Sequence, residues 1–292
     1  MAENYRLLLA LTTAGALAAA TLLSPAAPPL AAKPTVEAGA GQAVSPPAVA
    51  AVGAAAQPAG WDSAGSTGTV ANPASGRLEL VYPEPGKIAL VIGDSQADGA
   101  AGVPGSMAWP RLAAEAAGYV PLFRGRGGTG FTAARPDAAN YVTALRTQQW
   151  LVPHGGVGLV VIQGGGNDAR VGAGDAEIAD GAIELVRELR RSYPTAPMVM
   201  VGTLARAADD GGGRRHEVDA VLARAAAAAG VSFVPAGDWI TRLGLGPHLV
   251  DGTHLDAAGH RLAADALLAE LGGRGLLRDT AILAGGGQTP AG

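Results

Sequence analysis

The sequence predicts an α/β fold: a mostly parallel β-sheet that is covered by helices on both of its faces. Two observations lead to this prediction. Short apolar runs rich in branched residues alternate along the chain with longer segments of helical pattern, as in consecutive strand–helix units. The apolar runs are continuous, which indicates strands buried on both faces, as the strands of a parallel sheet are.

The first strand is predicted at Lys87–Gly93 (KIALVIG), a run of branched apolar residues that ends at a glycine. Met107–Gly118 has the pattern of a helix that its terminal glycine ends. Tyr119–Phe123 is a weaker strand prediction. Val157–Gln163 (VGLVVIQ) is the strongest strand prediction in the chain.

An amphipathic helix is predicted next, at Asp175–Pro194. Its acidic residues come early and its arginines come late, as the helix dipole favours. Two further strand–helix units follow, with strands at Pro197–Gly202 and Val231–Gly237 and helices at Arg214–Gly230 and Asp256–Leu271. Because ligands of such folds bind beyond the carboxyl ends of the strands, the loops that follow the strands are expected to hold the site.

The N-terminal residues have the order of a secretory signal. An apolar run at Leu7–Leu23 follows Arg6 and precedes Ser24 and Pro25. Residues 1–32 are therefore predicted to be a signal peptide that is cleaved near Ala32, and the protein is expected to be secreted or associated with the cell envelope. The run is close to the shortest length that spans a bilayer, so an uncleaved membrane anchor is the alternative.

Residues 33–77 contain mainly Ala, Pro, Gly and Ser and few large apolar residues. Such a segment cannot bury enough apolar surface to offset the entropy lost on ordering, so it is predicted to be a linker. The same reasoning makes residues 274–292 a flexible tail. Residues 78–273 remain as one domain, which is long enough to form a single core.

Composition excludes several kinds of site. The chain has no cysteine, which rules out disulfides, thiolate metal sites and a cysteine nucleophile. Its formal net charge is −4 and it shows no basic face, so no nucleic-acid partner is expected. Gly125–Gly130 (GRGGTG) matches a dinucleotide-binding pattern, but it follows the second strand and no acidic residue stands about 20 residues later. No cofactor and no metal are predicted.

Four segments carry groups that chemistry can use. Gly93-Asp94-Ser95 follows the first strand, Gly125–Gly130 the second, and Gly164–Asp168 (GGGND) the third, while Asp251–His254 (DGTH) precedes the last helix. Together they offer a hydroxyl, free backbone N–H groups, a side-chain amide and an acid–imidazole pair. These are the components of a serine hydrolase.

Each component has a chemical reason. The hydroxyl of Ser95, which is expected to open a helix, is a weak nucleophile and needs a base, which His254 can supply if an acceptor fixes its tautomer. Asp251 stands three residues before that histidine. Asp168 could compete as its orienter, but it is rather expected to hold its own loop. Donors aimed at the developing negative charge contribute roughly 3 kcal/mol each, and Asn167 offers one such N–H.

Structural roles outside the chemistry are expected for the other candidates. For Ser95 alone a helix cap would be the better interpretation, and its three partners decide against it. Asp94 is expected to shape the turn through hydrogen bonds. Solvated or capping roles are expected for the histidines without an acid three residues earlier, although His248 is near enough in sequence to line the site; these are His154, His216, His248 and His260.

The four segments, in this order and at these strand ends, resemble the sequence blocks of the SGNH (GDSL-like) hydrolase superfamily. The resemblance extends roughly over residues 88–271 and implies a flavodoxin-like three-layer α/β/α sandwich. It implies Ser95 as nucleophile, His254 as base and Asp251 as its orienter. It also implies an oxyanion hole formed by the Ser95 amide, Gly128 and Asn167.

Two positions depart from the pattern of this superfamily. Gln96 stands where Leu or Ile usually follows the serine, so contacts near the nucleophile are expected to differ. Phe123 stands where an Asn commonly opens the second block, which leaves the choice between Gly127 and Gly128 open.

The resemblance implies an exported serine esterase that cleaves small O-acyl esters through an acyl-enzyme. A small-molecule or carbohydrate ester is the expected substrate, with an acetylated sugar suggested by the family alone. Membrane association is expected only if the signal stays uncleaved. Two alternatives remain: an O-acyltransferase that uses the same site, and a non-catalytic carbohydrate-binding module that keeps the fold.

Overall fold

The predicted parallel sheet is present in residues 65–278, the part of the chain that the structure, a computed structural model, describes. All of its strand pairs are parallel. The spatial order of its strands is β4 (Val120–Gly125), β3 (Ile88–Gly93), β5 (Leu159–Gln163), β6 (Met198–Val201) and β7 (Ser232–Val234). Counted along the chain, this is the flavodoxin-like order 2-1-3-4-5, so the predicted fold class is confirmed.

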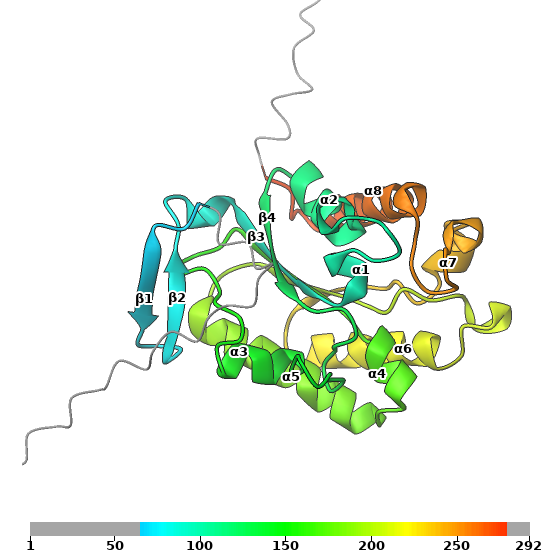
Figure 1. Cartoon of the computed structure of the whole chain (residues 1–292), viewed down its shortest axis with the longest axis horizontal. Helices are drawn as coiled ribbons and strands as arrows, with labels where there is room; N and C mark the ends of the chain where they lie inside the picture. Colours follow the sequence, from blue (N-terminus) through cyan, green and yellow to red (C-terminus); the bar gives the residue numbers. More distant parts are fainter. Residues whose placement is uncertain (1–64, 279–292) are drawn as a thin grey trace, which may run out of the picture. The chain divides into compact units, whose positions relative to one another are not determined.

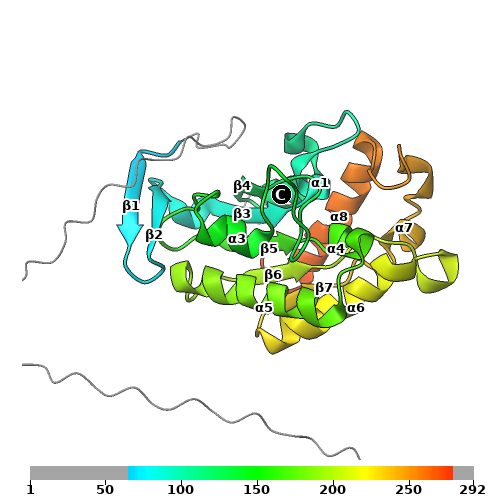
Figure 2. The same cartoon turned by 60° about the horizontal axis from the view of Figure 1, so that its bottom comes forward.

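Helices cover both faces of the sheet, as Figure 1 shows from one side and Figure 2 from another. One face carries α1 (Ser95–Asp98), α2 (Trp109–Ala116), α7 (Trp239–Arg242) and α8 (Ala257–Gly273). The other face carries α3 (Tyr141–Arg146), α4 (Gly166–Val171), α5 (Asp175–Ser192) and α6 (Gly213–Ala228). The short helices α3 and α4 are not among the elements that the sequence pattern predicts.

The alternation of side chains along the strands divides the core into two halves. In β3, Leu90 and Ile92 pack towards α3 and α5, whereas Ala89 and Val91 pack towards α2 and α8. Successive residues of a strand point to opposite faces, so a strand buried on both faces needs an apolar residue at every position. All six residues of β3 are buried. The continuous apolar runs in the sequence are the consequence of this burial.

A two-stranded antiparallel hairpin precedes the parallel sheet and differs from the sequence prediction. It consists of β1 (Gly68–Asn72) and β2 (Arg77–Val81), and residues 68–77 of it were expected in the linker. Its backbone joins the domain where Leu80 N donates to Val152 O at 2.8 Å. The folded region therefore begins ahead of the predicted boundary at Leu78.

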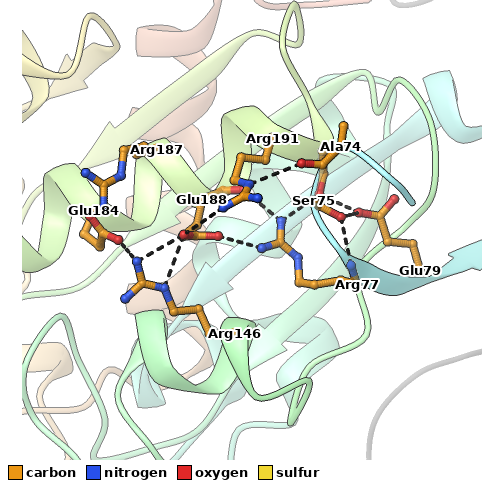
Figure 3. A network of polar contacts seen from close by, with 10 residues as sticks. Ala74, Ser75, Arg77, Glu79, Arg146, Glu184, Arg187, Glu188 and Arg191 are labelled. Atoms are coloured by element: carbon orange, nitrogen blue, oxygen red, sulfur yellow. Dashed lines mark hydrogen bonds and ion pairs between the residues drawn. The ribbon is translucent and has the colours of Figure 1, made fainter. Parts of the chain in front are cut away.

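A buried ion pair anchors this hairpin to α5 (Figure 3). Arg77 Nη1 lies 2.8 Å from Glu188 Oε2, and both side chains are almost completely buried. A second guanidinium, that of Arg146, approaches the same carboxylate at 3.1 Å. The sequence of residues 68–77 contains few apolar residues because polar contacts hold much of this segment in place.

Glu79 of β2 is a second buried acid that is fully satisfied by neighbouring donors. Its carboxylate accepts hydrogen bonds from Asn72 Nδ2 and Ser75 Oγ, both at 2.8 Å, and from Ser192 Oγ of α5 at 2.5 Å. A buried charge is tolerated when its acceptor positions are filled in this way.

The described chain also extends past the predicted end of the domain at Gly273. Arg274 donates to Phe233 O at 2.8 Å, and Arg278 N donates to Ala117 O at 3.1 Å, so residues 274–278, expected in the tail, contact the domain. The predicted signal peptide, residues 33–64 of the predicted linker and residues 279–292 lie outside the described residues. Within residues 65–278, no helix combines the length and apolar character that crossing a membrane requires.

We expect Glu188→Ala to lower the free energy of unfolding by about 3 kcal/mol, because Arg77 would be left buried without its carboxylate. Urea denaturation at neutral pH measures this change. The control is Glu84→Ala, which removes an exposed ion pair with Lys87 and should cost less than about 1 kcal/mol. Equal losses for the two variants would show that the Arg77–Glu188 pair does not anchor the hairpin.

Candidate active site

Ser95 stands directly after β3, at the point where the order of the sheet reverses. Its helix α1 is only four residues long and is capped by Asp94, whose Oδ1 accepts a hydrogen bond from Gln96 N at 2.9 Å. The neighbouring strand β4 ends beside β3, and the two backbones lie very close together at their last residues. A β-carbon on Gly125 would lie 1.8 Å from Gly93 O, so only glycine fits there. In this class of fold, ligands bind at the crevice where the strand order reverses.

The structure brings His254 to Ser95. Its Nε2 lies 2.8 Å from Ser95 Oγ, and its Nδ1 lies 2.7 Å from Asp251 Oδ2. An ionised carboxylate can only accept, so Nδ1 carries the proton and Nε2 presents its lone pair to the serine hydroxyl. This is the tautomer in which the imidazole can remove the proton of Ser95.

Asp251 also determines the shape of the loop that carries the histidine. Its Oδ1 accepts hydrogen bonds from Thr253 N at 3.0 Å and from His254 N at 2.8 Å. The hydrogen bond from the His254 side chain, aided by these backbone N–H groups, lowers the pKa of Asp251 to about 2. Although its side chain is half exposed to solvent, Asp251 therefore stays ionised at neutral pH.

The predicted oxyanion donors lie around the same serine. Gly128 has a φ of +86°, and within residues 65–278 its N–H makes no hydrogen bond to the protein. Gly127 differs, because its N–H points to Asp98 Oδ2 at 3.4 Å. This difference favours Gly128 over Gly127 as a donor that is available to a ligand.

Asn167 reaches the site from the first turn of α4, which follows β5. Its Nδ2 donates to Thr129 O at 3.0 Å and to Asp94 Oδ2 at 3.3 Å. Both N–H bonds of the amide thus face protein acceptors, and the longer of the two contacts is the one to Asp94.

Asp168, the competing orienter, lies elsewhere. Its carboxylate accepts hydrogen bonds from the backbone N–H groups of Phe131, Thr132 and Ala133, between 2.7 and 3.1 Å. It thereby holds the loop after β4 and makes no contact with His254.

The remaining histidines contact groups away from Ser95. Two of them contact the backbone: His260 Nδ1 accepts from Trp109 N at 3.1 Å, and His216 Nδ1 lies 2.8 Å from Gly237 O. Burial lowers the pKa of His260 to about 4, so it is neutral at neutral pH. The other two face carboxylates: His154 lies 3.0 Å from Glu79, and His248 lies 3.1 Å from Asp256.

Gln96 has a role that the sequence did not predict. Its Nε2 donates to Thr253 O at 2.9 Å, which links α1 directly to the residue before His254. The signal was present in the sequence as the departure from Leu or Ile at this position, but the partner lies 157 residues away. The amide therefore fixes the distance between the serine turn and the histidine loop.

Asp94 connects the ends of two neighbouring strands, β3 and β5. Besides capping α1 and facing Asn167, its Oδ1 lies 3.2 Å from the side-chain nitrogen of Gln163, the last residue of β5, when that amide is oriented to satisfy both of its ends. Burial raises the pKa of Asp94 to about 6, and the hydrogen bond from Gln96 N and the nearby Arg215 guanidinium offset part of this effect.

A cavity of about 950 Å³ opens over these groups. Ser95, His254 and Asn167 line it together with glycines, alanines and several arginines. Within residues 65–278, no cluster of three His, Asp or Glu side chains could hold a metal ion. The groups that the cavity presents are the Ser95 hydroxyl, an imidazole in the tautomer that can accept its proton, and N–H donors beside them.

Comparisons with known proteins identify the family of the chain. Residues 91–262 match the model of the GDSL-like lipase/acylhydrolase family. No curated protein matches the chain in sequence.

Three solved structures are similar to the chain to different degrees. A family two carbohydrate esterase from Clostridium thermocellum, as an active-site mutant, is 19% identical with a TM-score of 0.54, over 69% of this chain and 69% of that chain. The same kind of enzyme from Clostridium thermocellum in complex with cellohexaose is 19% identical with a TM-score of 0.50, over 68% and 69% of the two chains. The aryl esterase of M. smegmatis is 21% identical with a TM-score of 0.46, over 65% of this chain and 100% of that chain.

The raised pKa of Asp94 makes a prediction about stability. An unfolded Asp titrates near 3.8, so between about pH 4 and 6 the folded protein keeps a proton that the unfolded chain has lost. The free energy of unfolding should therefore fall as the pH rises through this window. In the wild type, Asp94 should contribute a fall of the order of 3 kcal/mol in the free energy of unfolding between about pH 4 and pH 7. We expect this contribution to be absent in Asp94→Asn. Urea denaturation at the two pH values measures it.

Burial also raises the pKa of Asp219 to about 6, and this group contributes its own slope in both proteins. The difference between the two curves therefore isolates Asp94. Parallel curves for the wild type and the variant would show that Asp94 ionises at its unfolded pKa.

Proposed function

The chain belongs to the GDSL-like lipase/acylhydrolase family and is an SGNH-type esterase, and from this premise we propose that Ser95, His254 and Asp251 carry out its reaction. One observation carries the proposal: Ser95 Oγ, the His254 ring and the Asp251 carboxylate form a continuous line of hydrogen bonds of 2.8 and 2.7 Å. A weak hydroxyl nucleophile becomes reactive when a base of the correct tautomer accepts its proton in this manner.

In the proposed acylation step, Ser95 Oγ attacks the ester carbonyl while His254 Nε2 takes its proton. The tetrahedral intermediate collapses when the alcohol leaves with the proton that His254 returns, and the acyl group stays on Ser95. Water then attacks the acyl carbonyl while His254 takes its proton. The bond to Ser95 Oγ breaks as His254 returns that proton to the serine, and the carboxylic acid is released. Asp251 stabilises the imidazolium through its contact with Nδ1 and is not itself protonated.

Negative charge on the carbonyl oxygen is proposed to be stabilised by the N–H groups of Ser95 and Gly128 and by the Asn167 amide. The free N–H of Gly128 supports its place in this set. For Asn167, the 3.3 Å contact with Asp94 is the weaker of its two hydrogen bonds, and we propose that it is exchanged for the oxyanion. Each such donor contributes roughly 3 kcal/mol to transition-state stabilisation.

Small O-acyl esters, with acetylated carbohydrates among them, are the proposed substrates. Among residues 65–278, no apolar residue other than alanine lines the cavity, so these residues offer no apolar surface that would stabilise a long acyl chain. The carbohydrate esterases of Clostridium thermocellum that share this fold are consistent with a sugar as the alcohol.

Export of this enzyme remains a proposal that is supported by the sequence of residues 1–32 alone. The basic, apolar and small-residue order there is that of a secretory signal.

The proposal is tested by Ser95→Ala. We expect hydrolysis of p-nitrophenyl acetate to fall by at least about 10³-fold with thermal unfolding nearly unchanged, because the nucleophile is lost while packing is kept. A serine-reactive organophosphonate should label the wild type at Ser95 and leave the variant unlabelled, as read by mass spectrometry.

The matched control is Ser106→Ala, which alters an exposed serine and should behave as the wild type. Hydrolysis that survives in Ser95→Ala would overturn the mechanism. Absence of both labelling at Ser95 and turnover in the wild type would instead favour a non-catalytic protein that keeps the fold and binds its ligand.

Asp251→Asn tests the orienting role of the acid. The amide keeps the shape of the loop but favours the wrong tautomer of His254, so we expect kcat to fall by about 10²–10⁴-fold. His254→Ala should be at least as severe, and the double variant should be little worse than His254→Ala alone, because the two residues act as a unit. Additive losses in steady-state kinetics would show that they work independently.

A further inference from the structure

The cavity over Ser95 is lined by more basic than acidic side chains. Five arginines line it, against two acidic residues, and the remaining lining is small or polar. The arginines come from three separate segments: the loop after β4, helix α4, and the start of α6. They are Arg126, Arg135, Arg170, Arg214 and Arg215.

In three of these arginines at least one terminal nitrogen already contacts a protein acceptor. Arg214 pairs with Asp175 at 2.6 Å and with Glu217 at 3.4 Å. Arg215 donates through Nε and Nη2 to Leu204 O. The guanidinium of Arg126 lies 3.5 Å from Asp137 and also near Asp98, a half-buried acid of the cavity wall.

Arg135 and Arg170 have terminal nitrogens without such acceptors. Arg135 uses only Nε, which lies 2.9 Å from Asp137 Oδ1, and Arg170 uses only Nε, which lies 3.4 Å from Asn167 Oδ1. Within residues 65–278, neither Nη1 nor Nη2 of these two residues makes a hydrogen bond, although Arg135 forms an ion pair with Asp137 through Nε. A guanidinium with both terminal nitrogens available can bind a carboxylate or a phosphate through two parallel hydrogen bonds.

Both side chains lie against groups of the proposed oxyanion hole. A β-carbon on Gly128 would lie 2.9 Å from Arg135 Cδ, so this side chain rests on the glycine, and Arg170 contacts Asn167 directly. They approach the site from different segments, one from the loop after β4 and one from α4. A substrate held at Ser95 would therefore meet both.

We propose that Arg135 and Arg170 form an anion subsite and that the preferred substrates are small esters that carry an oxyanion, a carboxylate or a phosphate, close to the ester bond. This inference rests on the proposed function, because it assigns the substrate class of that same site. Applied to a carbohydrate ester, it selects acidic sugars over neutral ones. The lack of apolar lining beyond alanine agrees with a polar, charged substrate.

The experiment compares three substrates that share one acetyl ester: an acetylated methyl glucuronide, the corresponding acetylated methyl glucoside, and the same glucoside with a 6-phosphate. The readout is the ratio of kcat/KM for each anionic ester to that for the neutral one. We expect the wild type to prefer at least one anionic ester by about 10-fold or more, since each hydrogen bond to a charged group is worth about that much. Which of the two is preferred identifies the oxyanion.

Arg135→Gln and Arg170→Gln should each lower this ratio, mainly through KM of the anionic ester, and the double variant should bring it close to one. The ratio is unaffected by a general loss of activity or of folded protein. Arg187→Gln is the control, because this exposed arginine of α5 lies outside the cavity and should leave the ratio unchanged. The preference should also weaken as the salt concentration rises from about 0.05 M to about 0.5 M.

The outcomes separate the two proposals. Hydrolysis of p-nitrophenyl acetate that depends on Ser95, together with a wild-type ratio of one or a ratio that both arginine variants leave unchanged, overturns the anion subsite alone. Absence of any hydrolysis that depends on Ser95 overturns the proposed function, and the subsite with it.

Discussion

A single buried carboxylate, that of Asp94, connects the segments on which the site depends. It caps the serine helix, faces the Asn167 amide and lies beside Gln163 at the end of β5, so it joins the two strand ends on either side of the point where the sheet order reverses. The cost of removing this charge from water is reduced by these donors and by the Arg215 guanidinium. Because hydrogen bonds to a buried charge are strong and directional, the positions of the serine turn and of Asn167 depend on one another.

The polar contacts around Ser95 also divide into two groups. Asp251 and His254 are held by local contacts within one short, partly exposed loop. Asp94 is buried, where electrostatic interactions are stronger, and the half-buried Asn167 lies beside it. A base at the rim can exchange its proton with water and substrate, whereas donors for a developing charge act most strongly where water is excluded.

Sequence periodicity was sufficient to predict the parallel sheet, because strands buried on both faces need unbroken apolar runs such as that of β3. The four strand-end segments could be placed for the same reason, since the carboxyl ends of parallel strands lie at one edge. The hairpin was missed because its anchor, Arg77 with Glu188, joins residues 111 positions apart and leaves no apolar pattern. The partner of Gln96 and the arginines of the cavity were missed because only the folded loops bring them together.

The histidine loop has a consequence for how such a site can arise and change. Asp251 orients His254 from three residues away. The arrangement of this acid and base is therefore fixed by contacts within residues 251–254 and does not depend on distant parts of the chain. Within residues 65–278, two long-range hydrogen bonds join this loop to the serine turn: His254 with Ser95, and Thr253 O with Gln96. Both hydrogen bonds reach adjacent residues of α1, so they hold the histidine loop against the serine turn at two neighbouring points. Few substitutions are therefore needed to align such a site. Gln96, which belongs neither to the acid nor to the base, makes one of the contacts that set the alignment.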